Sequence, residues 1–290
     1  MGTISTTVTA LARELGISRA ALYYRPKKPS DDEQVKTKIM AVMINDQAYG
    51  SRRVAIALTI NRKKAQRIMR AFGLKPKLRR GWRPMKPDDQ NRPETQVINI
   101  LQQICPLFQN IIWAGDFTYL WYQERFWYVA TAIDVYTREI VGWHIANHHT
   151  SDLIVRAFDD AVWRQGTTPI YFHSDQGSEY VSGAYAATLA KHHVVPSHSR
   201  KSSPWQNGFQ ESFYNNFKLE LGDIRRFAGV GELIATIHSQ INYYNQRRIH
   251  TALKMPPTVF KETRPQKKTA MAAAYVNSPL FTVAETRMTV

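Results

Sequence analysis

Cysteine is almost absent from this chain of 290 residues, in which Cys105 is the only one. A single thiol excludes an internal disulfide framework and a zinc site built from several thiolates. The chain has no run of about 18 apolar residues, which argues against a membrane span, and no hydrophobic signal segment at its start. These absences predict a cytoplasmic protein in which Cys105 is an ordinary free thiol.

Acidic residues are scarce in the first part of the chain. Residues 1–110 contain 21 Lys and Arg against 8 Asp and Glu, whereas residues 111–290 contain 18 against 15. A basic part joined to a nearly neutral part predicts that the basic part binds a polyanion, and nucleic acid is the most common one. An anionic membrane surface is less favoured, because the basic segments also carry apolar faces suited to a core.

Residues 1–28 predict a helix-turn-helix. Gly16 is placed in a tight turn between two short helices, and Ser18 is placed to cap the second helix. Many helical hairpins share this pattern, so the motif alone does not identify a DNA-binding module. The apolar positions of the two helices are Leu11, Leu15, Ile17, Ala21 and Leu22.

Residues 29–74 predict a second helical, DNA-binding region of the same kind. Ser51 and Asn61 are placed as caps of two helices, and Gly73 as the stop of the second. Four apolar residues of the second helix follow the i, i+3, i+4, i+7 spacing that predicts a buried stripe. These residues are Ala65, Ile68, Met69 and Phe72.

Cations form another face of that last helix, where Lys63, Arg67 and Arg70 are spaced i, i+4, i+7. A cationic helix face suits docking against phosphates and a groove. The alternative is a solvated basic face that keeps the protein soluble, and the concentration of charge favours DNA contact. The candidate DNA contacts here are Arg52, Arg53, Arg62, Lys63, Lys64, Arg67, Arg70, Arg79 and Arg80.

Residues 75–107 are predicted to be a basic, proline-rich linker. Four prolines fall within residues 75–95, which have little apolar periodicity. Trp82 lies among arginines in this segment, where stacking on a base and packing against a neighbour both remain open.

Residues 108–265 predict an α/β domain with a mixed sheet and flanking helices, preceded by the all-α helix-turn-helix region. Three runs rich in aromatic and β-branched residues, with short polar turns between them, predict an antiparallel meander. A helix, a short buried strand, a small helix, a strand and two helices follow. The three runs cover residues 111–122, 125–136 and 138–147, and the later elements cover 151–166, 168–175, 180–191, 193–198, 207–221 and 230–246. Residues 266–290 are a weakly patterned tail.

Two aspartates of this domain occupy positions that favour a functional site. Asp116 lies within an aromatic strand, where a charge is costly unless it has a partner. Asp175 ends the short buried strand and is followed closely by Gly177, a common arrangement at a site. Each has an ordinary alternative, since Asp116 could pair with an arginine and Asp175 could cap a turn.

A third carboxylate, Glu211, lies on a predicted amphipathic helix. Asn207 is placed to cap that helix, with Gln210 as its capping-box partner. Glu211, Asn215 and Lys218 fall on one side of the helix. The opposite, apolar side is formed by Phe209, Phe213, Phe217 and Leu221.

Three acidic oxygen donors without cysteine match Mg²⁺, with Mn²⁺ as a substitute, better than zinc. Two such ions about 3.5–4 Å apart can activate a water or a 3′-hydroxyl and stabilise the leaving oxygen of a phosphodiester. Lys218 is placed to hold a phosphate near the metals, and Glu220, close to the apolar side, is a weaker candidate ligand. Further candidate DNA contacts are Arg200, Lys201, Trp205 and Asn207.

The three carboxylates resemble the DDE signature of the retroviral-integrase superfamily, with 35 residues between Asp175 and Glu211 and Lys218 seven residues beyond Glu211. The words DFTYL, AIDVYTREIVGW, HSDQGSEY, SPWQNGFQESF and YNQRRIHTAL, with YGSRRVAIALTINRKKAQRIMRAFGL upstream, resemble the OrfB-type transposases of the IS-three insertion-sequence family. The resemblance covers residues 8–262 approximately.

The resemblance implies an RNase-H-like core that cleaves and transfers DNA strands with Mg²⁺, through a figure-eight and an excised circle. It also implies double-stranded transposon ends and target DNA as partners, and a homo-oligomer on that DNA. Full transposases of the family carry an upstream helix-turn-helix and leucine zipper joined by a frameshift. No heptad seam is present here, so an upstream-frame partner or fusion is expected, and the zinc module of retroviral integrases is lacking.

Three rival interpretations follow from other residues. A tyrosine recombinase needs an Arg/His cluster and a nucleophilic tyrosine, but Arg247, Arg248, His250 and Tyr275 have the wrong spacing. A zinc site could be sought among His173, His192, His193 and His198, for which core or strand-end roles are favoured in the absence of cysteines at ligand spacing. A DNA-binding regulator with an inactive core remains the non-enzymatic alternative.

Overall fold

The computed structural model describes residues 7–23, 28–77, 99–200 and 204–264. The chain divides into two compact units, Met1–Pro76 and Lys77–Val290, and each is described by itself. Within the described ranges, no helix is both long and apolar enough to cross a membrane. Several predictions fall outside the described residues: most of the linker, the tail, Arg79, Arg80, Lys201 and the side chain of Trp205.

The first unit begins with two short helices, α1 (Val8–Glu14) and α2 (Arg19–Tyr23). Gly16 adopts a φ of +64° in the turn between them, and the Ser18 hydroxyl accepts a hydrogen bond from the Ala21 N–H. The predicted turn and cap are therefore confirmed. The apolar side chains of this pair are nevertheless largely exposed, at 41% for Leu11, 56% for Leu15 and 43% for Ile17.

Three further helices complete the first unit: α3 (Lys28–Asn45), α4 (Ser51–Ala57) and α5 (Arg62–Ala71). Asn61 caps α5 through a 2.8 Å hydrogen bond from the Lys63 N–H, and Gly73 follows the helix with a φ of +65°. Both features confirm the sequence-based prediction.

Two details of these helices were wrongly predicted. Ser51 is the first helical residue and not the cap, because the extended residue that precedes the helix is Gly50, which has no capping side chain. In the apolar stripe of α5, Ala65, Ile68 and Met69 are buried, but Phe72 is 38% exposed. Phe72 lies just beyond the helix, where the Lys36 ammonium group sits 4.7 Å from its ring centroid.

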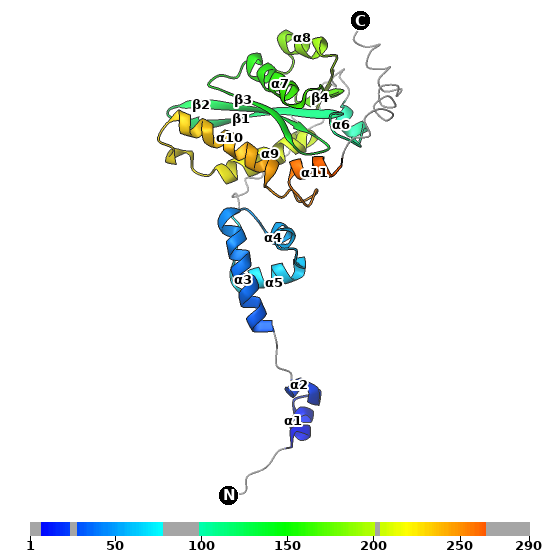
Figure 1. Ribbon diagram of the computed structural model, residues 1–290, viewed down its shortest axis with the longest axis vertical. Coiled ribbons are helices and arrows are strands. Elements are labelled where there is room, and N and C mark those ends of the chain that lie inside the picture. Colours follow the sequence, from blue (N-terminus) through cyan, green and yellow to red (C-terminus); the bar gives the residue numbers. More distant parts are fainter. Residues whose placement is uncertain (1–6, 24–27, 78–98, 201–203, 265–290) are drawn as a thin grey trace. The chain divides into compact units, whose positions relative to one another are not determined.

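The second unit is built on a five-stranded mixed sheet with the order β3-β2-β1-β4-β5 (Figure 1). β1, β2 and β3 form the predicted antiparallel meander, and β4 and β5 run parallel to β1. The strands are β1 (Ile112–Tyr122), β2 (Arg125–Asp134), β3 (Ile140–Ala146), β4 (Tyr171–Ser174) and β5 (Val195–His198).

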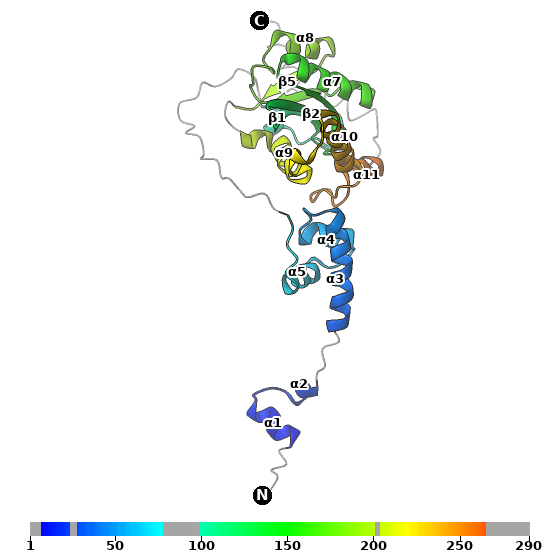
Figure 2. The same ribbon diagram turned by 90° about the vertical axis from the view of Figure 1, so that its left-hand side faces the viewer.

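Helices cover both faces of this sheet (Figures 1 and 2). α7 (Ser151–Gln165) and α8 (Gly183–Lys191) pack on one face, and α9 (Gly208–Leu221) and α10 (Val230–Gln246) pack on the other. The expected mixed sheet with flanking helices is confirmed. Shorter elements complete the unit: α6 (Ile100–Gln103), η1 (Pro204–Asn207), η2 (Ile224–Arg226) and α11 (Pro257–Thr263).

Successive residues of β1 supply two separate cores, because side chains alternate between the faces of a strand. Ile112 and Ala114 belong to the core beneath α9 and α10, whereas Trp113 belongs to the core beneath α7 and α8. On the second face Gly142 allows β3 to approach α7 closely, since a Cβ atom there would lie 2.4 Å from the backbone nitrogen of Ala161.

Candidate active site

Asp116 and Asp175 occupy equivalent positions on two neighbouring parallel strands. The pairing of β1 with β4 ends at Ala114 opposite His173. Asp116 and Asp175 each lie two residues beyond this pair, Asp116 within β1 and Asp175 directly after β4. Adjacent strands are about 4.8 Å apart, so the register places the two aspartates side by side where the short strand ends.

The charge of Asp116 is disfavoured by its surroundings. Burial and the negative charge of Asp175 raise the pKa of Asp116 to about 7, and Glu211 contributes in the same direction. The Phe117 N–H, which donates to Asp116 Oδ1 at 2.8 Å, and the Lys218 ammonium group act in the opposite direction. The three predicted carboxylates therefore interact electrostatically at one place, and a cation there would relieve their repulsion.

Side-chain hydrogen bonds fix helix α9 to strand β1. One residue that directly precedes the helix and two residues within it donate to three consecutive backbone carbonyls of the strand. Asn207 Nδ2 donates to Gly115 O at 3.1 Å, Gln210 Nε2 donates to Ala114 O, and the Tyr214 hydroxyl donates to Asp116 O at 2.7 Å. Glu211 follows Gln210 directly, so these bonds determine where its carboxylate can reach.

This arrangement corrects two sequence-based expectations. Asn207 precedes α9 but makes no side-chain capping bond, and Gln210 is fully buried instead of reaching back to the cap. Asn207 was also a candidate DNA contact, but its side chain is 6% exposed and bonded to β1. The capping-box prediction failed because both side chains turn toward the strands, where their NH2 groups donate to buried carbonyls and Gln210 Oε1 accepts from Thr131.

Strand β2 joins this network through Thr131, which pairs with Asp116 across the sheet. The Thr131 hydroxyl lies 3.0 Å from Gln210 Oε1 and 2.8 Å from the Tyr214 hydroxyl. Sequence reasoning missed Gln210, Tyr214 and Thr131 as supporting residues. The available signal was the polar spacing of Asn207, Gln210 and Tyr214 along an otherwise apolar side of the helix.

Glu211 and Lys218 lie on the outer side of α9. Glu211 is exposed in the first turn of the helix, and the Lys218 Nζ atom sits 5.0 Å from the ring centroid of Tyr119 on β1. Phe213, Phe217 and Leu221 are buried as predicted, and Phe209 is partly buried under the Arg138 guanidinium group.

The carboxylates do not form a closed ligand cage as they stand. Within the part of the chain that the structure describes, no three His, Cys, Asp or Glu side chains are grouped closely enough to hold a metal ion. Asp175 Oδ1 instead accepts a 3.0 Å hydrogen bond from the Gly177 N–H. The oxygen-only donor set and the raised pKa of Asp116 nevertheless fit a hard divalent cation, which would draw the three groups together.

A further acidic residue, Glu179, lies beside Asp175. A Cβ atom at Gly177 would lie 3.1 Å from Glu179 Oε2 and 3.2 Å from Asp175 Oδ1. Burial disfavours the charge of Glu179, but hydrogen bonds from His149, Ser178 and its own backbone outweigh this and lower its pKa. Its 2.6 Å contact with His149 Nδ1 makes Glu179 a partner of that histidine, a pairing that sequence reasoning did not find.

Two histidines behind Asp175 belong to the core. His173 Nδ1 lies 2.9 Å from Ser197 Oγ, and burial lowers the pKa of His173 to about 4. His198 Nδ1 lies 3.2 Å from the Asp175 carbonyl oxygen, and burial lowers its pKa too. Both histidines are therefore buried structural residues at the ends of β4 and β5, where burial disfavours their charged forms.

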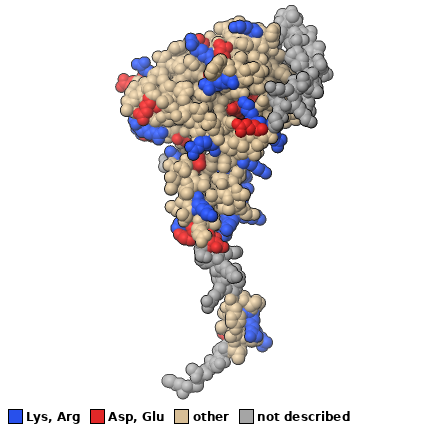
Figure 3. All heavy atoms as spheres, viewed as in Figure 1, with Lys and Arg blue, Asp and Glu red and all other residues tan. Residues whose placement is uncertain are grey.

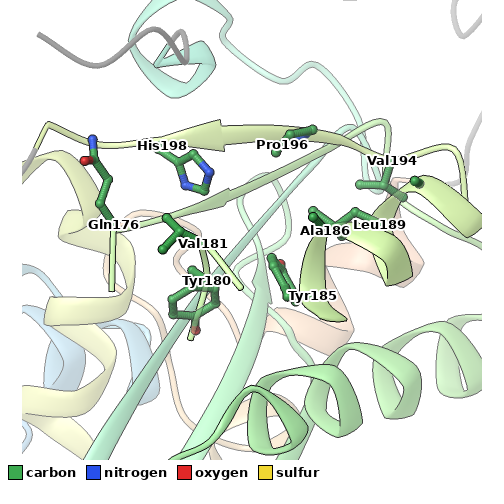
Figure 4. A pocket seen from close by; sticks show the side chains of 10 residues that line it. Gln176, Tyr180, Val181, Tyr185, Ala186, Leu189, Val194, Pro196 and His198 are labelled. Atoms are coloured by element: carbon green, nitrogen blue, oxygen red, sulfur yellow. The ribbon is translucent and has the colours of Figure 1, made fainter. Parts of the chain in front are cut away.

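A hollow of about 350 Å³ lies between α8 and the end of β5, next to Asp175 (Figure 4). His198 and Pro196 lie on one side of it, and Tyr180 and Tyr185 lie on the other. Its lining is mostly apolar, so we assign it to packing around the 175–182 loop.

The predicted DNA contacts of the first unit differ in their availability. Arg67 is bound in a bidentate ion pair to Asp32, with distances of 2.6 and 2.7 Å, and the Arg53 guanidinium group lies 5.5 Å from the ring centroid of Tyr49. Lys64 is half-buried. The remaining candidates are exposed: Arg52, Arg62, Lys63 and Arg70. Figure 3 shows Lys and Arg side chains distributed over this face of each unit rather than gathered in one patch.

In the second unit, Arg200 is exposed just beyond β5, at the end of the sheet where Asp175 lies. Arg248 has the opposite character, since it is 2% exposed and its Nε atom donates to Glu220 at 2.7 Å. This ion pair gives Glu220 and Arg248 a structural role in packing the YNQRRIH segment against α9. Arg248 is therefore not available for the arginine cluster that a tyrosine recombinase needs.

Comparison with known proteins identifies an integrase core in the same part of the chain as the three carboxylates. Residues 108–204 and 192–257 match two families that are each described as an integrase core domain. The chain is 32% identical over 244 residues to the transposase for insertion sequence element IS904 from Lactococcus lactis, covering 80% of this chain and 95% of that protein. It belongs to the family of insertion-sequence transposases with an integrase core.

Two further similarities agree with this assignment. The transposase InsF for insertion sequence IS3A from Escherichia coli is 28% identical over 261 residues, covering 84% of this chain and 90% of that protein. A chain of the cryo-EM structure of the simian T-cell lymphotropic virus intasome in complex with PP2A regulatory subunit B56 gamma has a TM-score of 0.50 and 14% identity. That match covers 80% of this chain and 79% of the other, and it shows that the transposase has the RNase-H-like fold of integrases.

Proposed function

We propose that this transposase cleaves and joins DNA strands at the ends of an insertion sequence, in a reaction that depends on Mg²⁺. The observation that carries the proposal is the convergence of carboxylates from β1, the end of β4 and α9. Burial and the negative charges of Asp175 and Glu211 raise the pKa of Asp116. Hard oxygen donors with excess negative charge suit Mg²⁺, and Mn²⁺ can replace it.

Asp116, Asp175 and Glu211 are the proposed ligands of two divalent ions. When bound, such a pair of ions polarises a phosphodiester and activates a water or a 3′-hydroxyl for in-line attack. Asn207, Gln210 and the Tyr214 hydroxyl hold the helix of Glu211 against β1 while this occurs. Lys218 holds a phosphate beside Asp116, whose charge it already stabilises.

We also propose that the first unit binds DNA through its exposed cations, with residues 1–28 and 29–74 as helical DNA-binding regions and residues 108–265 as the catalytic core. The partners are double-stranded transposon ends and target DNA. We further propose that the protein forms a homo-oligomer on the DNA and acts with an upstream-frame partner protein or as a frameshift fusion.

The test is incubation of the protein with the end sequence of its own element and Mg²⁺, followed by mapping of nicks and joined products. Asp116→Asn, Asp175→Asn and Glu211→Gln should each abolish strand cleavage and leave DNA binding largely intact. Asp159→Asn is the matched control, because Asp159 is exposed on α7, away from the three carboxylates. Cleavage near the wild-type rate in any of the three variants would refute the assignment of the metal ligands.

A second variant tests direct metal contact. Asp116→Cys should lose cleavage with Mg²⁺ and regain part of it with Mn²⁺, because a thiolate is a softer ligand that Mg²⁺ accepts poorly. A wild-type protein that binds the end sequence but cleaves under none of these conditions would instead support the DNA-binding regulator with an inactive core.

A further inference from the structure

One side of the β1–β2 hairpin carries a row of aromatic side chains that no part of the proposed reaction uses. Alternate residues of β1 face the same way, and the pairing of β1 with β2 places Tyr119 opposite Tyr128 and Trp121 opposite Phe126. We define the aromatic row as Phe117, Tyr119, Trp121, Phe126 and Tyr128.

The outer part of this row is exposed to an unusual extent. Tyr119 is 57% exposed, Trp121 is 56% exposed and Phe126 is 41% exposed. The opposite side of the hairpin is fixed in the core, where Leu120 and Tyr122 are buried. The open side of an antiparallel sheet is normally polar, so a contiguous exposed aromatic surface indicates a binding site.

The rings contact one another edge to face. Tyr119 and Phe126 have centroids 5.4 Å apart at an interplanar angle of 84°, and Trp121 and Phe126 have centroids 4.7 Å apart at 65°. At the inner end of the row the Phe117 ring is already stacked on His149, with centroids 6.1 Å apart at an interplanar angle of 11°. The exposed rings at the outer end, Tyr119, Trp121 and Phe126, are therefore the ones open to a planar partner.

Lys218 borders the row, which lies on the face of β1 opposite to the Asp116 side chain, since side chains alternate between the faces of a strand. Phe117 follows Asp116 in β1, and the strand rise places Trp121 roughly 17 Å along the strand from Asp116. The Lys218 Nζ atom sits 5.0 Å from the Tyr119 ring centroid, so a positive charge lies beside the exposed rings. Aromatic faces beside a cation are the combination by which proteins bind unpaired bases and the phosphates between them.

We propose that the outer end of the aromatic row, beside Lys218, binds unpaired nucleotides of DNA by stacking their bases on Trp121, Phe126 and Tyr119. The proposal deepens the proposed function, on which it rests. It requires bases that are free to stack on protein, because the bases of an intact duplex already stack on one another.

The experiment measures the affinity of the full chain for a fluorescein-labelled oligothymidylate and for a blunt duplex of the same length. The double variant Trp121→Ala, Phe126→Ala should bind the oligothymidylate about tenfold more weakly or worse, with little change for the duplex. Trp163→Ala is the matched control, since Trp163 is 79% exposed on α7 and lies outside the row. It should bind both DNAs as the wild type does.

A conservative variant separates stacking from loss of folding. Trp121→Phe should keep the oligothymidylate affinity, because phenylalanine retains a flat ring. A base that stacks on Trp121 should quench its fluorescence, so this variant should lose that part of the quenching seen when the wild type binds the oligothymidylate. Trp163→Phe should keep that quenching. Unchanged oligothymidylate affinity in the double variant, or an equal loss for duplex and oligothymidylate, would overturn the proposal. Dissociation of an oligomer with unchanged affinity would overturn it in favour of contact between copies of the chain.

Failure of this proposal can be distinguished from failure of the proposed reaction. Asp116→Asn should abolish strand cleavage yet keep the oligothymidylate affinity and the Trp121 quenching. Loss of cleavage in Asp116→Asn together with an unaffected double variant would refute the aromatic row alone. If the wild-type protein never cleaves DNA but the double variant still loses affinity for the oligothymidylate, the proposed reaction alone would be refuted.

Discussion

The hydroxyl of Tyr214 lies 2.7 Å from the backbone carbonyl oxygen of Asp116, so a residue of α9 is bonded directly to the strand position of a carboxylate whose pKa is raised. Tyr214 also reaches Val129 O at 3.0 Å and Thr131 at 2.8 Å. One side chain thus joins both strands of the hairpin to the helix that carries Glu211. The relative positions of the candidate ligands depend on this small buried polar network.

Tyr214→Phe is predicted to lower the free energy of unfolding by about 1–2 kcal/mol, because it removes a hydroxyl with several buried partners. It should also slow strand cleavage while leaving DNA affinity unchanged, since Glu211 loses its fixed position. Urea denaturation and cleavage rates measure the two effects. Tyr185→Phe is the control, because the buried Tyr185 hydroxyl has no hydrogen-bond partner among the described residues. Equal effects of the two variants would show that the Tyr214 network has no special role.

The pKa of Asp116 predicts a pH-dependent stability of the metal-free protein. The folded-state pKa of about 7 lies above the ordinary value of 3.8, so the folded protein binds the extra proton more tightly than the unfolded chain does. The contribution of this group is fully present below pH 3.8 and is lost as the pH rises through about 7. The amide introduced by Asp116→Asn does not titrate, so this variant should be more stable than the wild type at pH 8 and should lose most of that advantage at pH 5. Thermal unfolding in the presence of a chelator measures this difference, and a stability difference that is independent of pH would contradict it.

Gly115→Ala is predicted to destabilise the second unit by about 1–3 kcal/mol. A Cβ atom at Gly115 would overlap the buried Phe172 ring and lie 3.3 Å from the Tyr180 hydroxyl, so the Phe172 ring or the strand beside Asp116 would have to move. Gly231→Ala on α10 is the matched control, because a Cβ atom there has open space and alanine favours a helix. Denaturant titration should show a loss for the first variant and no loss for the second.

The cations of α5 are predicted to contribute unequally to DNA binding. Lys63→Ala and Arg70→Ala should each weaken binding and reduce the slope of log affinity against log salt by about 1, as loss of one phosphate contact requires. Arg67→Ala should change the slope less, because Asp32 already holds the Arg67 guanidinium group. Equal changes for all three variants would show that DNA displaces Asp32 from Arg67.

Most of the second unit could be predicted from local sequence. The strands β1, β2 and β3 consist of aromatic and β-branched runs with short polar turns, and these features specify pairing between neighbours in the chain. The amphipathic period of α9 correctly divided Phe213 and Phe217 from Glu211 and Lys218. Sequence spacing and strand position also predicted that Asp116, Asp175 and Glu211 belong to one candidate site.

Contacts between distant segments were not predictable in the same way. Gln210 occupies a position where a capping-box partner and a strand-binding amide look identical in sequence, and only the neighbouring carbonyls of Ala114 and Thr131 distinguish them. The pairing of Glu179 with His149 likewise joins two loops that sequence spacing does not relate. Phe72 follows the periodic pattern of α5 but falls beyond the end of the helix, so its period no longer applies.

The bonds that Asn207, Gln210 and Tyr214 make to β1 also determine when the site comes into existence during synthesis. A nascent chain that has emerged as far as β5 already contains all five strands of the sheet, with Asp116 and Asp175, but it lacks helix α9, which carries Glu211. Domains are made from the N-terminus onward, so the last of the three proposed ligands arrives only with α9. If the proposed ligand set is correct, a partly made or prematurely terminated transposase has an incomplete centre, and the proposed cleavage activity arises only after α9 has been made.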